Sequence, residues 1–153
     1  MRATLAFAAA GVMVAACGSS PAVQRSASPT TSTPAVVAVE VKTVKGQTEP
    51  VLVSANAQTL YYLTSDTAAT VACTVQCATF WPQLLLPPGD PFSGSSLPGK
   101  LRVLADANGR QVLYNGHPLS AFVKDKASGD ANGEGVNALG GTWHPATPSL
   151  AAM

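Results

Sequence analysis

An internal repeat is the feature that most restricts how this chain can fold. At an offset of 59 residues, two segments carry the same or a similar residue at five positions. The pairs are Val53 and Val112, Asn56 and Asn115, Leu60 and Leu119, Leu63 and Phe122, and Asp66 and Asp125. Trp81-Pro82 corresponds to Trp143-His144-Pro145 with a small shift. One short unit of this kind cannot bury its own apolar face, so we expect two related units packed into a single domain.

The local patterns predict a mostly β fold. β-Branched residues are frequent in the candidate strands 36–42, 50–53 and 58–64. The clearest hairpin joins residues 101–105 to residues 110–114, and Asn115-Gly116 supplies the positive φ angles of a second tight turn. We expect a further strand at 119–123, with most strands lying in 51–64 and 101–123. Residues 87–98 and 129–141 are expected to be loops, and the one short helix candidate, 73–80, is stopped by Pro82.

The N-terminal residues have the order of a secretory signal. Arg2 precedes an apolar run at 3–16, small residues follow, and then comes Cys17. The run is shorter than the roughly 20 residues that a membrane span needs. A Cys in this position resembles the bacterial lipobox, in which the thiol receives acyl chains such as palmitate. We therefore expect a signal peptide at 1–16, a lipidated N-terminus and disordered Ser/Pro/Thr-rich tether at 17–38, and a folded domain at 39–150.

The charge balance limits the classes of partner. The chain has nine Lys and Arg and eight Asp and Glu, and Arg2 would leave with the signal. A neutral chain without a basic run argues against nucleic acid as a partner. The lipid would be the contact with the membrane, and the sequence names no protein or small-molecule partner.

Several ordered motifs resemble a known family. Residues 60–66 carry a Y-x4-D pattern, residues 73–82 carry C-x3-C-A-x2-W-P, residues 108–119 contain Q-V-x-Y-N-G-x-P-L, and residues 129–135 carry G-D-x-N-G-x-G. This series resembles the bacterial lipoproteins described as "secreted repeat of unknown function". The matching motif residues are Tyr61, Asp66, Trp81, Pro82, Tyr114, Asn115, Gly116, Pro118 and Asp125. The resemblance implies an exported location and a repeated architecture, and the family's biochemical role is unassigned.

Two positions depart from the family pattern. The second repeat normally has an aromatic residue after Pro-Leu, where this chain has Ser120. Leu63 stands where another aromatic residue is common. We therefore expect the local aromatic packing to differ from that of the family.

Cys73 and Cys77 have two possible roles. In an oxidising compartment an even pair of cysteines by default forms a disulfide. Because residues four apart in a strand are separated by about 13 Å, the segment must bend for the bond to form. The alternative is a copper or redox site in which His117 joins the two thiolates, since thiolate and imidazole ligands suit copper. His144 is the other histidine that could contribute.

Other residues suggest chemistry, but each has a structural explanation. Asp125, Asp130, Asn132 and Glu134 offer oxygen ligands for calcium, although their spacing differs from that of an EF-hand. Asp66 and Asp125 form a symmetric pair that could act as acid and base, or could accept backbone N–H bonds at turns. The aromatic residues form either one core or an exposed ligand-stacking surface; they are Tyr61, Tyr62, Trp81, Tyr114, Phe122 and Trp143.

These patterns predict an exported, lipid-anchored protein of the cell envelope at the extracytoplasmic face of the membrane. We expect a non-catalytic binding or structural module with a disulfide-stapled aromatic core, without a cofactor or metal. The alternative is a copper-handling or redox accessory protein. The sequence contains no Ser-His-Asp elbow, phosphate loop or zinc signature that would support an enzyme.

Overall fold

The computed structural model describes residues 35–153. The predicted signal peptide, Cys17 and most of the predicted tether therefore lie outside the described residues. The described part contains eight β-strands and a single turn of 3₁₀ helix, with no α-helix, so the mostly β prediction is confirmed. None of its helical structure is long and apolar enough to cross a membrane.

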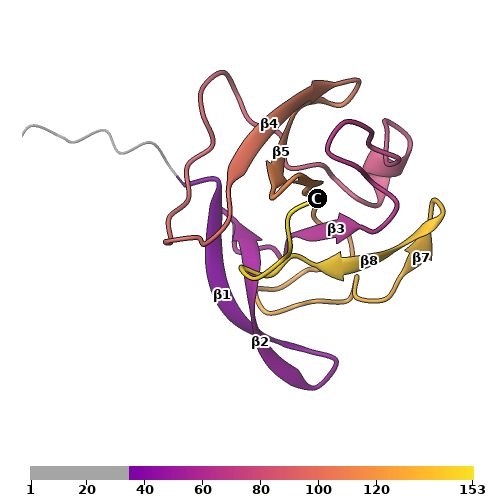
Figure 1. Cartoon of the computed structure of the whole chain (residues 1–153). Helices are drawn as coiled ribbons and strands as arrows, with labels where there is room; N and C mark the ends of the chain where they lie inside the picture. The colour runs from indigo at the N-terminus through magenta and orange to yellow at the C-terminus, as the bar shows by residue number, and fades with distance from the viewer. Residues whose placement is uncertain (1–34) are drawn as a thin grey trace, which may run out of the picture. The chain divides into compact units, whose positions relative to one another are not determined.

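The strands form three small sheets (Figure 1). The first is a hairpin of β1 (Val37–Val44) and β2 (Gln47–Ser54). The second places β8 (Gly141–Pro145) between β3 (Tyr61–Leu63) and β7 (Asn137–Ala138). The third has the order β4 (Leu101–Asp106), β5 (Gly109–Tyr114) and β6 (His117–Pro118). The helical turn η1 (Cys77–Thr79) lies between β3 and β4 in the sequence.

The two repeats exchange the segments that carry Trp81 and Trp143. In the first repeat, the N–H of Leu60 donates to the carbonyl oxygen of Leu52, and the carbonyl oxygen of Leu60 accepts from the N–H of Ala146. In the second repeat, Leu119 N–H donates to Val112, and Leu119 accepts from Leu84 N–H. The segment after Trp81 thus pairs with the second repeat, and β8, which carries Trp143, pairs with the first. Neither repeat is complete without the other.

Tyr61 and Ser120 meet where the two repeats join. They occupy equivalent places in the repeats, and each backbone N–H donates to the other's carbonyl oxygen, at 2.7 and 3.0 Å. The offset of 59 residues therefore holds at this point. The offset fails for Val53 and Val112. The N–H of Leu119 donates to Val112, whereas the N–H of Leu60 donates to Leu52, so Leu52 and not Val53 is the equivalent of Val112. The connection from Leu52 to Leu60 is one residue longer than its counterpart.

The core of the described part of the chain consists of three apolar clusters. The largest lies between the repeats; its buried members are Val37, Leu52, Leu60, Val112, Tyr114, Leu119 and Ala146. The second is mainly aromatic and includes the disulfide; its buried members are Tyr61, Leu63, Cys73, Trp81, Phe122 and Trp143. A small third cluster, Val44, Val51 and Val53, lies in the β1–β2 hairpin. All members come from residues 36–150, so residues 32–153, which form one compact unit, carry a complete core of their own.

Several predicted elements need correction. Residues 119–123 do not form a strand, because after Ser120 the chain turns and Asp125 N–H bonds back to Phe122. Residues 129–141 are not all loop, since β7 lies among them and β8 begins at their end. β1 begins at Val37, and the N–H of Met153 donates to the carbonyl of Asn115.

Candidate functional site

The tyrosine of the first Y-x4-D motif contacts the aspartate of the second. Tyr61 Oη donates to Asp125 Oδ2 at 2.7 Å and accepts Gly133 N–H at 3.2 Å. Asp125 Oδ1 accepts from Asn132 N–H at 2.9 Å, and its side chain is buried. The Y-x4-D motif therefore links the repeats, since its tyrosine comes from one repeat and its aspartate from the other. Asp125 is a buried carboxylate, and both of its oxygens accept hydrogen bonds.

The equivalent aspartate of the first repeat lacks such a tyrosine. Asp66 Oδ1 accepts Ala72 N–H at 2.7 Å, as Asp125 accepts from Asn132. The place of Tyr61 is taken here by Ser120, whose side chain carries no ring. Burial raises the pKa of Asp66, and the bond from Ala72 only partly opposes this rise. Both aspartates thus accept backbone N–H groups at turns, which is the structural alternative considered for them.

Stability at alkaline pH should depend on Tyr61. Its folded-state pKa is raised, mainly by burial and then by the hydrogen bond to Asp125. Since the unfolded chain releases this proton near pH 10, the folded state loses about 1.4 kcal/mol of stability per pH unit above that value from this group. Urea unfolding of wild type and Tyr61→Phe between pH 9 and pH 11 measures the difference. We expect a shallower loss in the variant, and identical slopes would contradict the assignment.

Two tryptophans stack at the centre of the aromatic cluster. The rings of Trp81 and Trp143 lie 3.9 Å apart between centroids with an interplanar angle of 6°. Phe122 stacks on Trp81 at 4.2 Å, and Tyr61 meets Trp81 edge-on at 5.4 Å. A Cβ atom at Gly133 would lie 2.8 Å from both Trp81 and Tyr61, so only glycine leaves room for this packing. Of the two alternatives, the aromatic residues do not form one single core, because Tyr114 belongs to a different cluster.

Cys73 and Cys77 form a disulfide with their Cα atoms 5.2 Å apart. The required bend is a turn in which Cys77 N–H donates to Thr74, followed by η1. Side-chain amides of Gln83 and Asn108 donate to the carbonyl of Cys73 and fix it further. The bond therefore anchors the loop that leads into Trp81.

His117 lies in different surroundings from the cysteine pair. Its ring packs against Tyr62 at 4.9 Å, and its Nε2 lies 3.0 Å from the carbonyl of Ala151. Within residues 35–153, no group of three His, Cys, Asp or Glu side chains is placed to hold a metal ion. The structure thus does not bring together the three ligands of the copper alternative.

Removing the disulfide should weaken the fold without abolishing it. The bond closes a loop of five residues, for which chain entropy predicts about 2 kcal/mol of stabilisation. The double variant Cys73→Ala with Cys77→Ala should melt several degrees lower and keep its β-type circular dichroism. Residues 32–153 exported to an oxidising compartment provide the material, with thiol counting as the check on the bond. Tight binding of one Cu(I) by the reduced domain, lost in the double variant, would contradict a structural role.

The acidic stretch after Asp125 is bonded within the chain. Asp130 Oδ2 accepts the N–H groups of Ala127 and Lys126, which lower its pKa. Glu134 lies 2.9 Å from His144 Nδ1 and 3.6 Å from Lys45 Nζ. These carboxylates accept turn N–H groups and contact the His144 side chain of β8.

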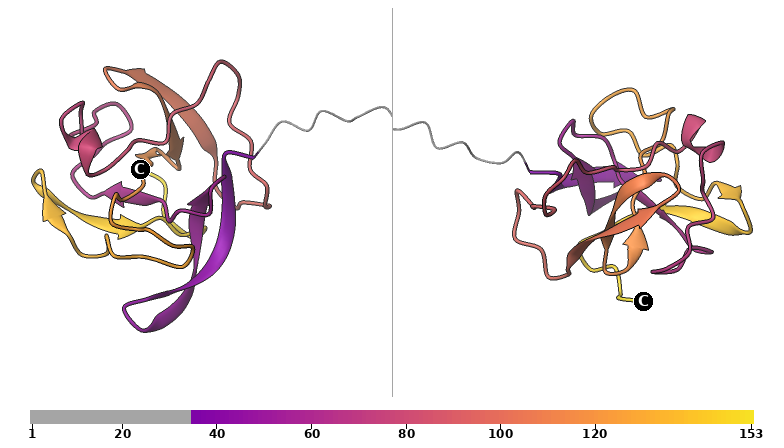
Figure 2. Two further views of the ribbon diagram at one scale, coloured as in Figure 1. Left: turned by 180° about the vertical axis from the view of Figure 1, so that it is seen from behind. Right: turned by 90° about the horizontal axis from the view of Figure 1, so that it is seen from above.

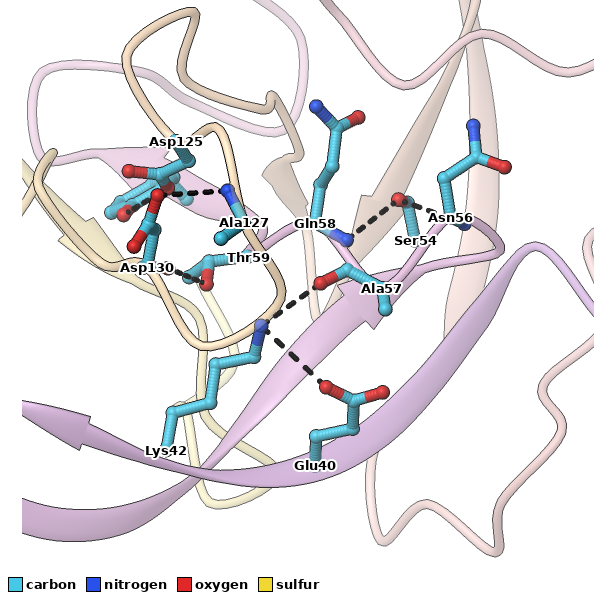
Figure 3. A network of polar contacts seen from close by, with 11 residues as sticks. Glu40, Lys42, Ser54, Asn56, Ala57, Gln58, Thr59, Asp125, Ala127 and Asp130 are labelled. Atoms are coloured by element: carbon cyan, nitrogen blue, oxygen red, sulfur yellow. Dashed lines mark hydrogen bonds and ion pairs between the residues drawn. The ribbon is translucent and has the colours of Figure 1, made fainter.

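A buried lysine, which the sequence analysis did not single out, lies beside this stretch (Figure 3). The Lys42 side chain is 1% exposed, and its Nζ donates to the carbonyl of Ala57 at 2.9 Å and lies 3.5 Å from Glu40. Thr59 Oγ1 donates to the carbonyl of Asp130 nearby. Together these bonds attach the β2–β3 turn to β1 and to the second repeat.

The remaining motif residues hold the C-terminal segment. Tyr114 Oη donates to the carbonyl of Pro148 at 2.7 Å, and Asn115 Nδ2 donates to that of Leu150 at 2.8 Å. Asn115 and Gly116 adopt φ angles of 51° and 93°, which form the predicted turn before Pro118. Pro82 accepts the N–H of Ala121 across the repeat interface.

Comparison with known proteins identifies one of the repeats. Residues 103–147 match the model of the family described as "secreted repeat of unknown function". No curated protein and no solved structure matches the chain. The match runs from β4 to just beyond β8 and includes Tyr114, Asn115, Gly116, Asp125 and Trp143. The resemblance seen in the motifs is thereby confirmed for residues 103–147, which are similar to a secreted repeat of this family.

Proposed function

We propose that this chain is an exported protein held by a lipid on Cys17 at the extracytoplasmic face of the cell membrane. The observation that carries the proposal is the order of Arg2, the apolar run 3–16 and Cys17 in the sequence. The match of residues 103–147 to a secreted repeat supports the exported location. A single acyl chain binds membranes only weakly, so stable anchoring would need more than one chain on this cysteine.

In this proposal the folded domain is a non-catalytic binding or structural module. Support comes from the groups that could have served as acid or base. The Asp125 carboxylate accepts hydrogen bonds from Tyr61 and Asn132. The Glu134 carboxylate lies within ion-pair distance of His144 and Lys45. Disulfide, stacked tryptophans and exchanged strands all favour one rigid arrangement of the two repeats.

Replacing the lipidated cysteine should release the protein from the membrane. Wild type should fractionate with membranes, incorporate labelled palmitate, and begin at an acylated Cys17 by mass spectrometry. Cys17→Ser should lose the label and the mature N-terminus, because serine offers no thiol for acylation. Ser20→Ala is the matched control and should behave as wild type. A Cys17→Ser protein that keeps its label would refute the anchor.

A further inference from the structure

An apolar cleft opens beside the disulfide, between η1 and the β7–β8 hairpin. Figure 1 and Figure 2 show these two elements side by side on one side of the domain. The cleft has a volume of about 330 Å³, within the range of small-molecule sites. Its walls include Phe80, Trp81, Phe122, Val136 and Leu139, with Lys124 as the one charged residue.

The walls of this cleft expose large apolar side chains to solvent. Phe80 is 58% exposed and Leu139 is 47% exposed, and Val75 in the disulfide loop is 68% exposed. Single exposed apolar residues are common on protein surfaces, but here two of them face one concavity. Covering them with an apolar ligand would remove this area from water.

The floor of the cleft is preformed. Trp81 is stacked on both Trp143 and Phe122, and the Cys73–Cys77 bond holds the turn that leads to Phe80. A rigid floor lowers the ordering entropy that a ligand must overcome. The disulfide therefore stabilises one wall of the site as well as the fold.

Lys124 gives the cleft its charge. The ion pairs of residues 35–153 do not include Lys124, so its ammonium group has no carboxylate within 4 Å in the described chain. A cation at the edge of an apolar cleft complements a molecule with an apolar body and one anionic end.

We propose that this cleft binds a small amphiphilic anion, with its apolar tail against Phe80, Trp81 and Leu139 and its carboxylate at Lys124. The inference deepens the proposed binding role and rests on it, because it names the class of ligand. It does not depend on the lipid on Cys17, which the fractionation experiment tests separately.

Dodecanoate below its critical micelle concentration is the probe, added to residues 32–153 at pH 8. Calorimetry should show saturable binding of one molecule, with a change in tryptophan fluorescence because Trp81 lines the cleft. Lys124→Gln should weaken binding about fivefold, the effect of losing one partly exposed ion pair. Lys126→Gln is the matched control, since this lysine does not line the cleft, and it should bind as wild type.

A second variant tests the apolar wall without endangering the fold. Leu139 has a φ angle of 54°, a conformation that asparagine tolerates better than leucine. Leu139→Asn should therefore stay folded while weakening dodecanoate binding about tenfold. Dodecanol should bind wild type and Lys124→Gln equally, because it has no charge to lose.

Three results would overturn the proposal. One is the absence of saturable dodecanoate binding. Another is dodecyltrimethylammonium binding as tightly as dodecanoate. The third is binding to anionic phospholipid vesicles that dodecanoate does not compete away, which would make this face a membrane-docking surface instead. The first two leave the anchored, non-catalytic module of the proposed function intact, and only the Cys17 experiment can remove the anchor.

Discussion

Trp143→Ala should lower the free energy of unfolding by about 3–5 kcal/mol, the usual cost of deleting a large buried aromatic side chain. Trp143 is fully buried and stacks face to face on Trp81 from the other repeat. Within residues 35–153 its indole Nε1 has no hydrogen-bond partner, so the loss would come from packing and from the cavity left behind. Equilibrium unfolding in urea, followed by circular dichroism, measures the change.

Phe80→Ala is the control for this prediction. Phe80 carries an aromatic ring close to Trp81 in sequence but is more than half exposed. Its removal should change stability by about 0.5 kcal/mol or less. Comparable losses in the two variants would show that the stacked tryptophans do not hold the repeats together.

The two aspartates of the repeat should differ in their contribution to stability. Asp125→Ala leaves the buried Tyr61 hydroxyl and the part-buried Asn132 N–H without their acceptor, and a buried donor without an acceptor costs about 1–3 kcal/mol. We expect a total loss of about 3–5 kcal/mol. Asp66→Ala orphans only the Ala72 N–H and should cost about 1–2 kcal/mol.

The raised pKa of Asp66 widens this difference. A carboxyl whose folded-state pKa is raised contributes stability at low pH and loses it as the pH rises through the folded value. Above the unfolded-state pKa of this carboxyl, burial therefore lowers the stability of the folded state, and replacing Asp66 relieves that cost. Urea unfolding of both variants at pH 7 tests the order. An Asp66 variant as unstable as the Asp125 variant would show that Tyr61 adds nothing.

Turn chemistry explains which elements could be predicted. Asn115-Gly116 forms the expected turn because both residues tolerate positive φ at low cost. The turns at Lys45-Gly46 and Leu139-Gly140 also have positive φ at both positions, yet lysine and leucine give no local signal for it. Residues 119–123 have the composition of a strand, yet among them only Ser120 forms β-bridges, and from Phe122 the chain turns to Asp125.

Burial in β1 shows the limit of strand periodicity. Alternation of valines would place Val41 inside with Val37 and Val39, yet Val41 is 69% exposed and Lys42 is buried. The β2–β3 turn and β1 itself supply the reason, because the Lys42 ammonium donates to the Ala57 carbonyl in that turn and lies close to Glu40 on its own strand. Such partners come from the folded chain and leave no trace in the strand's own pattern.

The sequence alone determined the mostly β class, the two repeats, the family resemblance and the bend at Cys73 and Cys77, because neighbouring residues carry that information in their turn chemistry, spacing and repetition. Only the tertiary structure decided three contacts. Tyr61 donates to the aspartate of the other repeat, the segments that carry Trp81 and Trp143 each pair with the other repeat, and Phe80 borders an apolar cleft. The contact between Tyr61 and Asp125 joins residues 64 positions apart, and the partners of the exchanged segments are chosen by which strand completes which sheet.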